Sequence, residues 1–364
     1  MTIVTQPDSA LPNERVRDAE LPYAPSWVDR LIAWIERLPM PAWLFYLLVL
    51  FATLLIEHIV QWMDGSLPTG SISPALAAEA PYLVFALAAY QYLNTIARRA
   101  LREFRAALQI ADTEYTILEY ELTAVPARPA LVATLIGVVL AVSSLLSTPA
   151  AFGLYPGTST ATALILVLYI VIQSPFYIVL IYHTLRQLRL VTAIDTRVRE
   201  INLFQLFPVY AFSALTARTG LAIVFLLYYS YFFLYYLNVR GSTPGFLGVV
   251  TLVVLLLVAL ACFVLPLYGI HLRLAQEKSR LLGDANRRLE FALSDLHQRV
   301  DSGDYDKVDG IQKTLSALKA EHDVLEKIST WPWKTETLRS FISIIALPII
   351  LYLISRFLGR LVGL

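Results

Sequence analysis

Seven long apolar stretches, separated by loops that differ sharply in their content of Lys and Arg, constrain this chain more than any other feature. A helix needs about 20 apolar residues to cross a hydrocarbon core of about 30 Å, and it must satisfy its own backbone hydrogen bonds there. The stretches therefore predict an all-α, polytopic integral membrane protein with about seven transmembrane helices and a helical cytoplasmic domain. We place the spans at residues 41–63, 79–97, 130–147, 160–183, 219–238, 246–270 and 338–358.

The composition agrees with a lipid environment and narrows the partners. Hydrophobic residues make up 57% of the 364 residues and charged residues only 16%, whereas soluble domains hold about 25% charged residues. The 29 basic residues are balanced by 28 acidic ones, which leaves no concentrated cationic surface for nucleic acid. The single cysteine, Cys262, rules out an intrachain disulfide and a thiolate metal cluster. We therefore expect the lipid bilayer as a partner, no nucleic acid, no cofactor and no metal.

The distribution of Lys and Arg predicts the orientation. The N-terminal tail holds four of these residues, and the loops after the second, fourth and sixth spans hold five, five and eleven. The loops after the first and third spans hold none, and the loop after the fifth holds only Arg240. Because cytoplasmic loops are enriched in Lys and Arg, we predict a cell-membrane protein with its N-terminus and charged loops in the cytoplasm and its C-terminus outside. Arg356 and Arg360 oppose this last assignment and leave a re-entrant final segment open.

The N-terminal residues precede the first span in two parts. Residues 1–25 carry four prolines among charged residues, which predicts a disordered cytoplasmic tail. Residues 26–40 begin with a plausible N-cap, Ser26, and predict an amphipathic helix that lies on the inner leaflet. The expected apolar face of this helix consists of Trp27, Leu31, Trp34, Ile35 and Leu38.

Polar helices with an apolar period are expected to continue the inward-going spans. Within the six-helix region of residues 41–270, we expect cytoplasmic extensions at 98–128 and 184–218, the first as one helix from Ala97 to Tyr120. Residues 271–330 hold two helical patterns joined by an acidic turn, which predicts an antiparallel hairpin. The apolar residues expected to face each other in it are Leu282, Leu289, Leu293 and Leu296 on one helix and Ile311, Leu315, Leu318 and Leu325 on the other.

Residues 331–364 are expected to return to the membrane and form the seventh helix. The indoles of Trp331 and Trp333 suit the headgroup level, where aromatic residues gather. Pro175, Pro266 and Pro348 fall within spans four, six and seven and are hinge candidates, because proline kinks a helix. Proline is also common in membrane helices that do not bend in function, so both interpretations stand.

Glu57 is the first functional candidate, because it is the only ionisable side chain other than its neighbour His58 in the apolar core of the first six spans. A charged group at that depth is costly unless it is paired, neutral or exposed to water. Gln61, four residues on, shares the Glu57 face, whereas His58 points about 100° away. These three polar residues predict a proton relay, a cation site or a pore lining. The alternative is a protonated Glu57, or one that reaches the outer interface beside Gln61.

The fifth span is unusually aromatic. Its tyrosines include Tyr228, Tyr231 and Tyr235, whose hydroxyls could line a pocket or a pore. The alternative is the ordinary belt of aromatic side chains at the outer boundary of the membrane. His183 and His271, which end spans four and six, are expected to belong to a polar belt at the inner boundary.

No sequence pattern of a zinc hydrolase, a serine hydrolase, a P-loop or a dinucleotide-binding fold is present, so we expect a non-enzymatic protein. Two functions remain open. The first is a conduit, meaning a channel or transporter, with its path near Glu57 and a cytoplasmic helical assembly or gating domain. The second is a membrane-anchored sensor or scaffold that binds a cytoplasmic partner or a second copy through residues 271–330.

Overall fold

The computed structural model describes residues 21–346 except 109, 197–202, 204–209, 233–245, 304–307, 334–335, 337 and 344–345. Within these residues the regular structure is helical, apart from one isolated bridge between Pro25 and Pro126. The helices are α2 (Trp27–Glu36), α3 (Ala42–Met63), α4 (Pro74–Glu79), α5 (Pro81–Leu108), α6 (Asp112–Thr123), α7 (Ala127–Ser147), the 3-10 helix η1 (Pro149–Phe152), α8 (Thr160–Thr196), α9 (Ala211–Phe232), α10 (Phe246–Ser302) and α11 (Val308–Lys327).

Four of the described helices are long and apolar enough to cross a bilayer. They lie at Ala42–Met63, Ala127–Ser147, Thr160–Ile194 and Leu257–Ser302, in α3, α7, α8 and α10. The all-α class and a membrane protein with several apolar helices are therefore confirmed. Most of the expected seventh span, including Pro348, lies outside the described residues.

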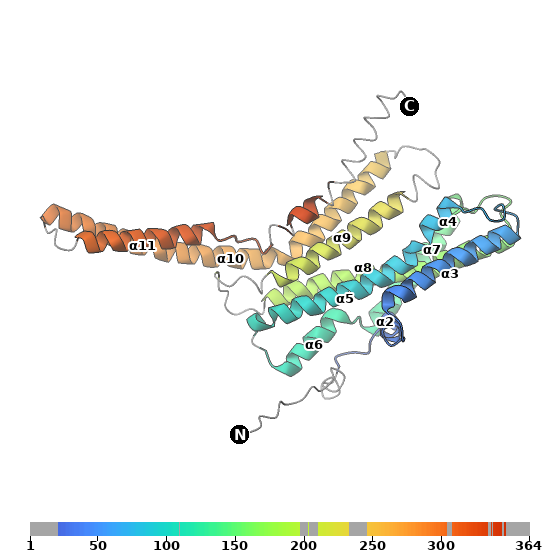
Figure 1. The fold of residues 1–364 in the computed structure, drawn as a ribbon, viewed down its shortest axis with the longest axis horizontal. Helices are drawn as coiled ribbons and strands as arrows, with labels where there is room; N and C mark the ends of the chain where they lie inside the picture. The colour runs from blue at the N-terminus through green and yellow to red at the C-terminus, as the bar shows by residue number, and fades with distance from the viewer. Residues whose placement is uncertain are drawn as a thin grey trace, which may run out of the picture.

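The helices that carry the second and fifth expected spans, α5 and α9, belong to the same bundle (Figure 1). The apolar part of α9 within the described residues, Ala211–Leu226, is short, and α5 carries Gln91, Asn94 and Arg98 near its middle. Helix α5 packs against α3, α6, α8 and α9 and is buried along much of its length. Because neighbouring helices cover it, α5 does not need a continuous apolar surface toward lipid.

The closest approach of two apolar helices joins α7 to α8. A Cβ atom on Gly137 of α7 would lie 2.8 Å from the Cα of Pro175 and 2.9 Å from its N. A glycine on one helix, facing a proline that has no N–H on the other, lets the two backbones touch. The helix α8 continues through Pro175, as α10 continues through Pro266.

The hairpin expected at residues 271–330 is present as an antiparallel pair of helices. Helix α10 runs unbroken from the bundle into the hairpin, and α11 packs back along it (Figure 1). Gly303 ends α10 with a φ of 72°, a left-handed conformation that favours glycine. Leu325 is 2% exposed, as a facing residue should be, but Leu293 is 43% exposed and Ala285 is buried instead.

The two indoles after the hairpin stack on one another and on α10. Trp331 stacks on His271 of α10 with ring centroids 3.8 Å apart, and Trp333 stacks on Trp331 at 4.5 Å. Phe263 continues the stack at 4.8 Å from Trp333. Aromatic stacking onto α10 therefore fixes the return of the chain.

The single helix expected from Ala97 to Tyr120 is wrong. Helix α5 ends at Leu108 and α6 begins at Asp112, so that α6 folds back against α5 (Figure 1). An ion pair between Arg105 and Asp112 spans the break. The sequence did not reveal this break, because Leu118 and Leu122 of α6 are buried in the same core as the apolar residues of α5 and so continue the apolar period.

We expect Gly137→Ala to destabilise the protein, because the new Cβ meets the backbone of α8, which cannot rotate away. Overpacking of this kind costs about 1–3 kcal/mol. Gly269→Ala on α10 is the matched control, since nothing lies within 4 Å of its added Cβ and the gain in helix propensity is the same. Thermal unfolding of the two purified variants in nanodiscs checks this, and equal Tm values would contradict the close approach.

Candidate functional site

Glu57 is deeply buried near the end of α3 that is continuous with the loop to α4. It lies seven residues before Asp64, or about 10 Å along the helix axis. Its side chain is 1% exposed, and neither carboxyl oxygen has a hydrogen-bond partner among the described residues. Glu57 therefore does not reach the surface beside Gln61, which was one of the alternatives from the sequence.

His58 has a structural role that the sequence did not predict. Its Nε2 accepts a hydrogen bond from the backbone N–H of Ser73 at 3.1 Å, so its Nδ1 donates to the carbonyl of Leu54 at 2.8 Å. These bonds define the neutral form of the ring. As expected from their positions on α3, Glu57 and His58 do not pair. His58 instead attaches the start of α4 to α3.

A second carboxyl group, that of Glu79, is also buried. Glu79 ends α4 and is 5% exposed. The hydroxyl of Tyr169 on α8 donates to the backbone carbonyls of Glu79 and Ala80 at 3.0 and 3.1 Å. Tyr169 thus fixes the end of α4 to α8.

Polar residues continue from Glu57 to the end of α3, where they meet the start of α8. On α3, Glu57, Gln61 and Asp64 succeed one another at four and three residues, which places them on one face. The carboxylate of Asp64 accepts hydrogen bonds from Ser159 and Thr162 at the start of α8. Hydrogen bonds from Ser159, Ser66 and Thr162 hold the pKa of Asp64 well below its usual range, so this group is ionised at neutral pH.

The structure places a cavity of about 220 Å³ between α5, α8 and α9. Its lining residues are Pro81, Tyr82, Val84, Phe85, Tyr177, Phe225, Leu226 and Tyr229. The fifth expected span therefore contributes to a pocket, through Phe225, Leu226 and Tyr229. The side chains of Tyr228 and Tyr231 lie outside the described residues, as does Tyr235. Phe225 and Tyr229 lie four residues apart, on one face of a helix, and this spacing could have identified them as residues that line the cavity.

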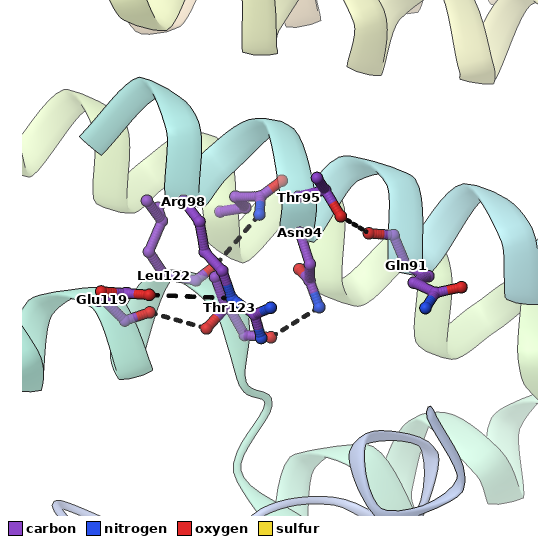
Figure 2. Close-up of polar contacts among 8 residues, drawn as sticks. Gln91, Asn94, Thr95, Arg98, Glu119, Leu122 and Thr123 are labelled. Atoms are coloured by element: carbon purple, nitrogen blue, oxygen red, sulfur yellow. Dashed lines mark hydrogen bonds and ion pairs between the residues drawn. The ribbon is translucent and has the colours of Figure 1, made fainter. Parts of the chain in front are cut away.

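At the other end of the bundle, side chains from α5 and α8 satisfy the last carbonyl groups of α6. Asn94 donates to the carbonyl of Thr123 at 2.9 Å, as Figure 2 shows. Gln187 donates to the carbonyl of Leu122 at 3.1 Å, and Arg186 to those of Glu121 and Ala124. The last carbonyls of a helix have no partner within it, so these bonds fix the end of α6 to the bundle.

The N-terminal segment joins the same polar network. Tyr23, which fell within the expected disordered tail, is packed here: its hydroxyl donates to the carbonyl of Ala124 at 2.9 Å and accepts from Arg186 at 2.7 Å. Burial raises the pKa of Tyr23 to about 12, which keeps this hydroxyl a donor. The expectation of disorder is therefore wrong for residues 21–25, which the structure describes, and untested for residues 1–20.

Asp29 of α2 does not belong to the apolar face expected for this helix. Its carboxylate accepts hydrogen bonds from the Ser26 backbone and hydroxyl, from the backbone N–H of Val125 and from the hydroxyl of Tyr90. The expected helix and its N-cap Ser26 are confirmed. The expected apolar face of this helix is only partly right. Ile35 is buried and Trp27 and Leu31 pack against the core, but Trp34 is 51% exposed and Val28 and Ile32 are buried as well.

Neither His183 nor His271 is exposed. His183 is fully buried, bonds Asn94 at 2.7 Å and stacks on Tyr90 with ring centroids 4.3 Å apart. His271 stacks on Trp331, as described above. A hydrogen bond from its Nδ1 to the carbonyl of Thr330 is 3.1 Å long. Both rings hold neighbouring segments in place.

Comparison with known proteins gives no further guide to the site. No protein-family model matches the chain, and no curated protein or solved structure matches it either.

We expect Asp29→Asn to destabilise the end of the bundle near α6. An amide has one acceptor oxygen in place of two, and its NH2 group would face the N–H and O–H donors that now bond the carboxylate. The loss of satisfied buried hydrogen bonds costs about 1–3 kcal/mol. Glu36→Gln is the matched control, since it changes the same charge on the same helix and touches one exposed hydrogen bond, from Gln91. A lower Tm for Asp29→Asn alone supports the network, and equal Tm values would refute it.

Proposed function

We propose that this protein is a seven-span conduit of the cell membrane, with its path beside α3 at Glu57. The observation that carries the proposal is the buried carboxyl group of Glu57, which has no hydrogen-bond partner among the described residues. Unpaired ionisable groups inside membrane proteins are costly and are found along ion and proton paths. The polar faces of α3 and α8 that continue to Asp64 support the same assignment.

The proposed orientation places the N-terminus and the hairpin in the cytoplasm, with the C-terminus outside. Thr69→Cys and Arg288→Cys, each in a Cys262→Ser background, test the first six spans, since both side chains are exposed. We expect a membrane-impermeant maleimide to label Cys at 69 from outside intact cells and Cys at 288 only after the cells are opened. The reverse pattern would contradict the orientation.

Flux through the purified protein in liposomes tests the conduit. Under an imposed potential, we expect ion or proton flux above that of empty liposomes, reduced at least tenfold by Glu57→Gln because the ionisable group is lost. Gln61→Ala is the control on the same face, which keeps Glu57 and should reduce flux less. Flux that is unchanged by Glu57→Gln would remove the site from the path, and no flux at all would remove the conduit.

The second candidate function is a sensor or scaffold that acts through the hairpin. It is favoured by apolar side chains that α10 and α11 leave exposed, above all Phe291, which is 81% exposed, and Val324, at 53%. Exposed apolar surface on a projecting element is typical of an interaction site. Leu315→Asp in the hairpin should abolish a scaffold activity and leave the flux of a conduit intact, whereas Glu57→Gln should do the opposite.

A further inference from the structure

We infer that the cavity between α5, α8 and α9 binds a small, uncharged aromatic molecule that enters it from the bilayer. The cavity measures about 220 Å³. An apolar cavity of about 150 Å³ is enough to bind benzene, whereas pockets that enclose drug-sized ligands measure roughly 300–1,000 Å³. The volume therefore fits a single substituted ring. This inference goes beyond the proposed conduit and does not depend on it.

The walls of the cavity are aromatic rings that pack on one another. Tyr82 of α5 meets Tyr177 of α8 and Tyr229 of α9 edge to face, with ring centroids 5.7 and 5.0 Å apart. Phe225 of α9 packs on Phe85 of α5 at 4.8 Å and stacks on Tyr229 at 5.9 Å. Aromatic rings attract each other in offset-stacked and edge-to-face arrangements. A bound ring can join this set in the same two geometries.

Two of the tyrosine hydroxyls are engaged with the backbone, which fixes their rings. Tyr177 donates to the carbonyl of Tyr82 at 2.6 Å, and Tyr229 donates to the carbonyl of Ala78 in α4. The rest of the lining surface is almost wholly carbon. Because a buried polar group without a partner is costly, the ligand that fits is uncharged and has few polar atoms. Apolar side chains complete the lining, from Pro81, Val84 and Leu226.

The cavity is within reach of lipid. Phe225, at one wall, is 52% exposed. Tyr177, at another, lies within the apolar segment Thr160–Ile194 of α8, which is long enough to cross a bilayer. Apolar molecules dissolve in the hydrocarbon core, so the bilayer itself delivers the ligand sideways to the site.

Lipid acyl chains, which surround the entrance, match the cavity less well than an aromatic ring does. A methylene chain in the bilayer already has apolar neighbours, so it gains little by moving into an apolar cavity. An aromatic molecule gains contacts with other rings, which the acyl chains do not offer. The aromatic walls therefore favour a ring over the lipid around it.

Photolabelling of the full-length protein in liposomes tests the site with a defined probe, 3-trifluoromethyl-3-phenyldiazirine. Light releases N2 from this apolar aromatic molecule, and the remaining carbene inserts into a neighbouring C–H or O–H bond. We expect mass spectrometry to find adducts on the lining residues Tyr177 and Tyr229, and toluene to lower these adducts severalfold. The same concentration of n-heptane should lower them much less, because it lacks a ring.

Filling the cavity separates this site from general exposure to lipid. Val84→Phe on α5 and Leu226→Trp on α9 add bulk from two different walls, and each should lower the labelling of Tyr177 severalfold. Val139→Phe on α7 is the matched control, because Val139 is 65% exposed and does not line the cavity. It should leave the labelling of Tyr177 unchanged.

The outcomes that would overturn the inference are distinct. Competition by n-heptane equal to that by toluene would replace the aromatic ligand with an acyl chain. Labelling of Tyr177 and Tyr229 that toluene does not lower, or that both filled variants leave unchanged, would remove the site. The competition uses the wild-type protein, so it decides the inference even where a filled variant fails to fold.

Discussion

A buried carboxyl group without a hydrogen-bond partner is the constraint on which the account of this bundle depends. Polar groups in an apolar interior are tolerated when they are satisfied, and each unsatisfied one is unfavourable by about 1–3 kcal/mol or more. The two ends of α8 differ in this respect. At the end near α6, Asp29, Asn94 and Arg186 have two or more partners each, whereas Glu57, near the other end, has none among the described residues.

This difference separates a structural polar network from a functional one. The polar network around Asp29, Asn94 and Arg186 bonds the last carbonyl groups of α6, attaches α2 to the bundle and joins Tyr23 to α8. Its residues therefore hold helices together. The carboxyl group of Glu57 joins no helices among the described residues. Its position is fixed instead by neighbours, namely His58, which anchors α4, and Tyr169, which bonds the backbone after α4. A rigid frame around a group that lacks partners is what a binding site requires.

Sequence reasoning predicted the elements better than their contacts. Apolar runs and helical periods predicted α3, α7, α8 and the α10–α11 hairpin, because lipid and helix geometry act locally along the chain. The break between α5 and α6 was missed, since the buried Leu118 and Leu122 continue an apolar period after the chain has turned. Glu57 was found as a single acid in an apolar run. The hydrogen bond between His58 and Ser73 was not predicted, because it arises from the folding of α4 onto α3, which no local pattern encodes.

The Tm of Glu57→Gln in nanodiscs is the most direct test of this account, with Asp29→Asn as the comparison. We expect Glu57→Gln to leave the Tm unchanged or higher, because the carboxyl group of Glu57 has no hydrogen bond to lose among the described residues. A Tm lowered as much as that of Asp29→Asn would show that Glu57 holds the bundle together, and would contradict a carboxyl group kept free for function.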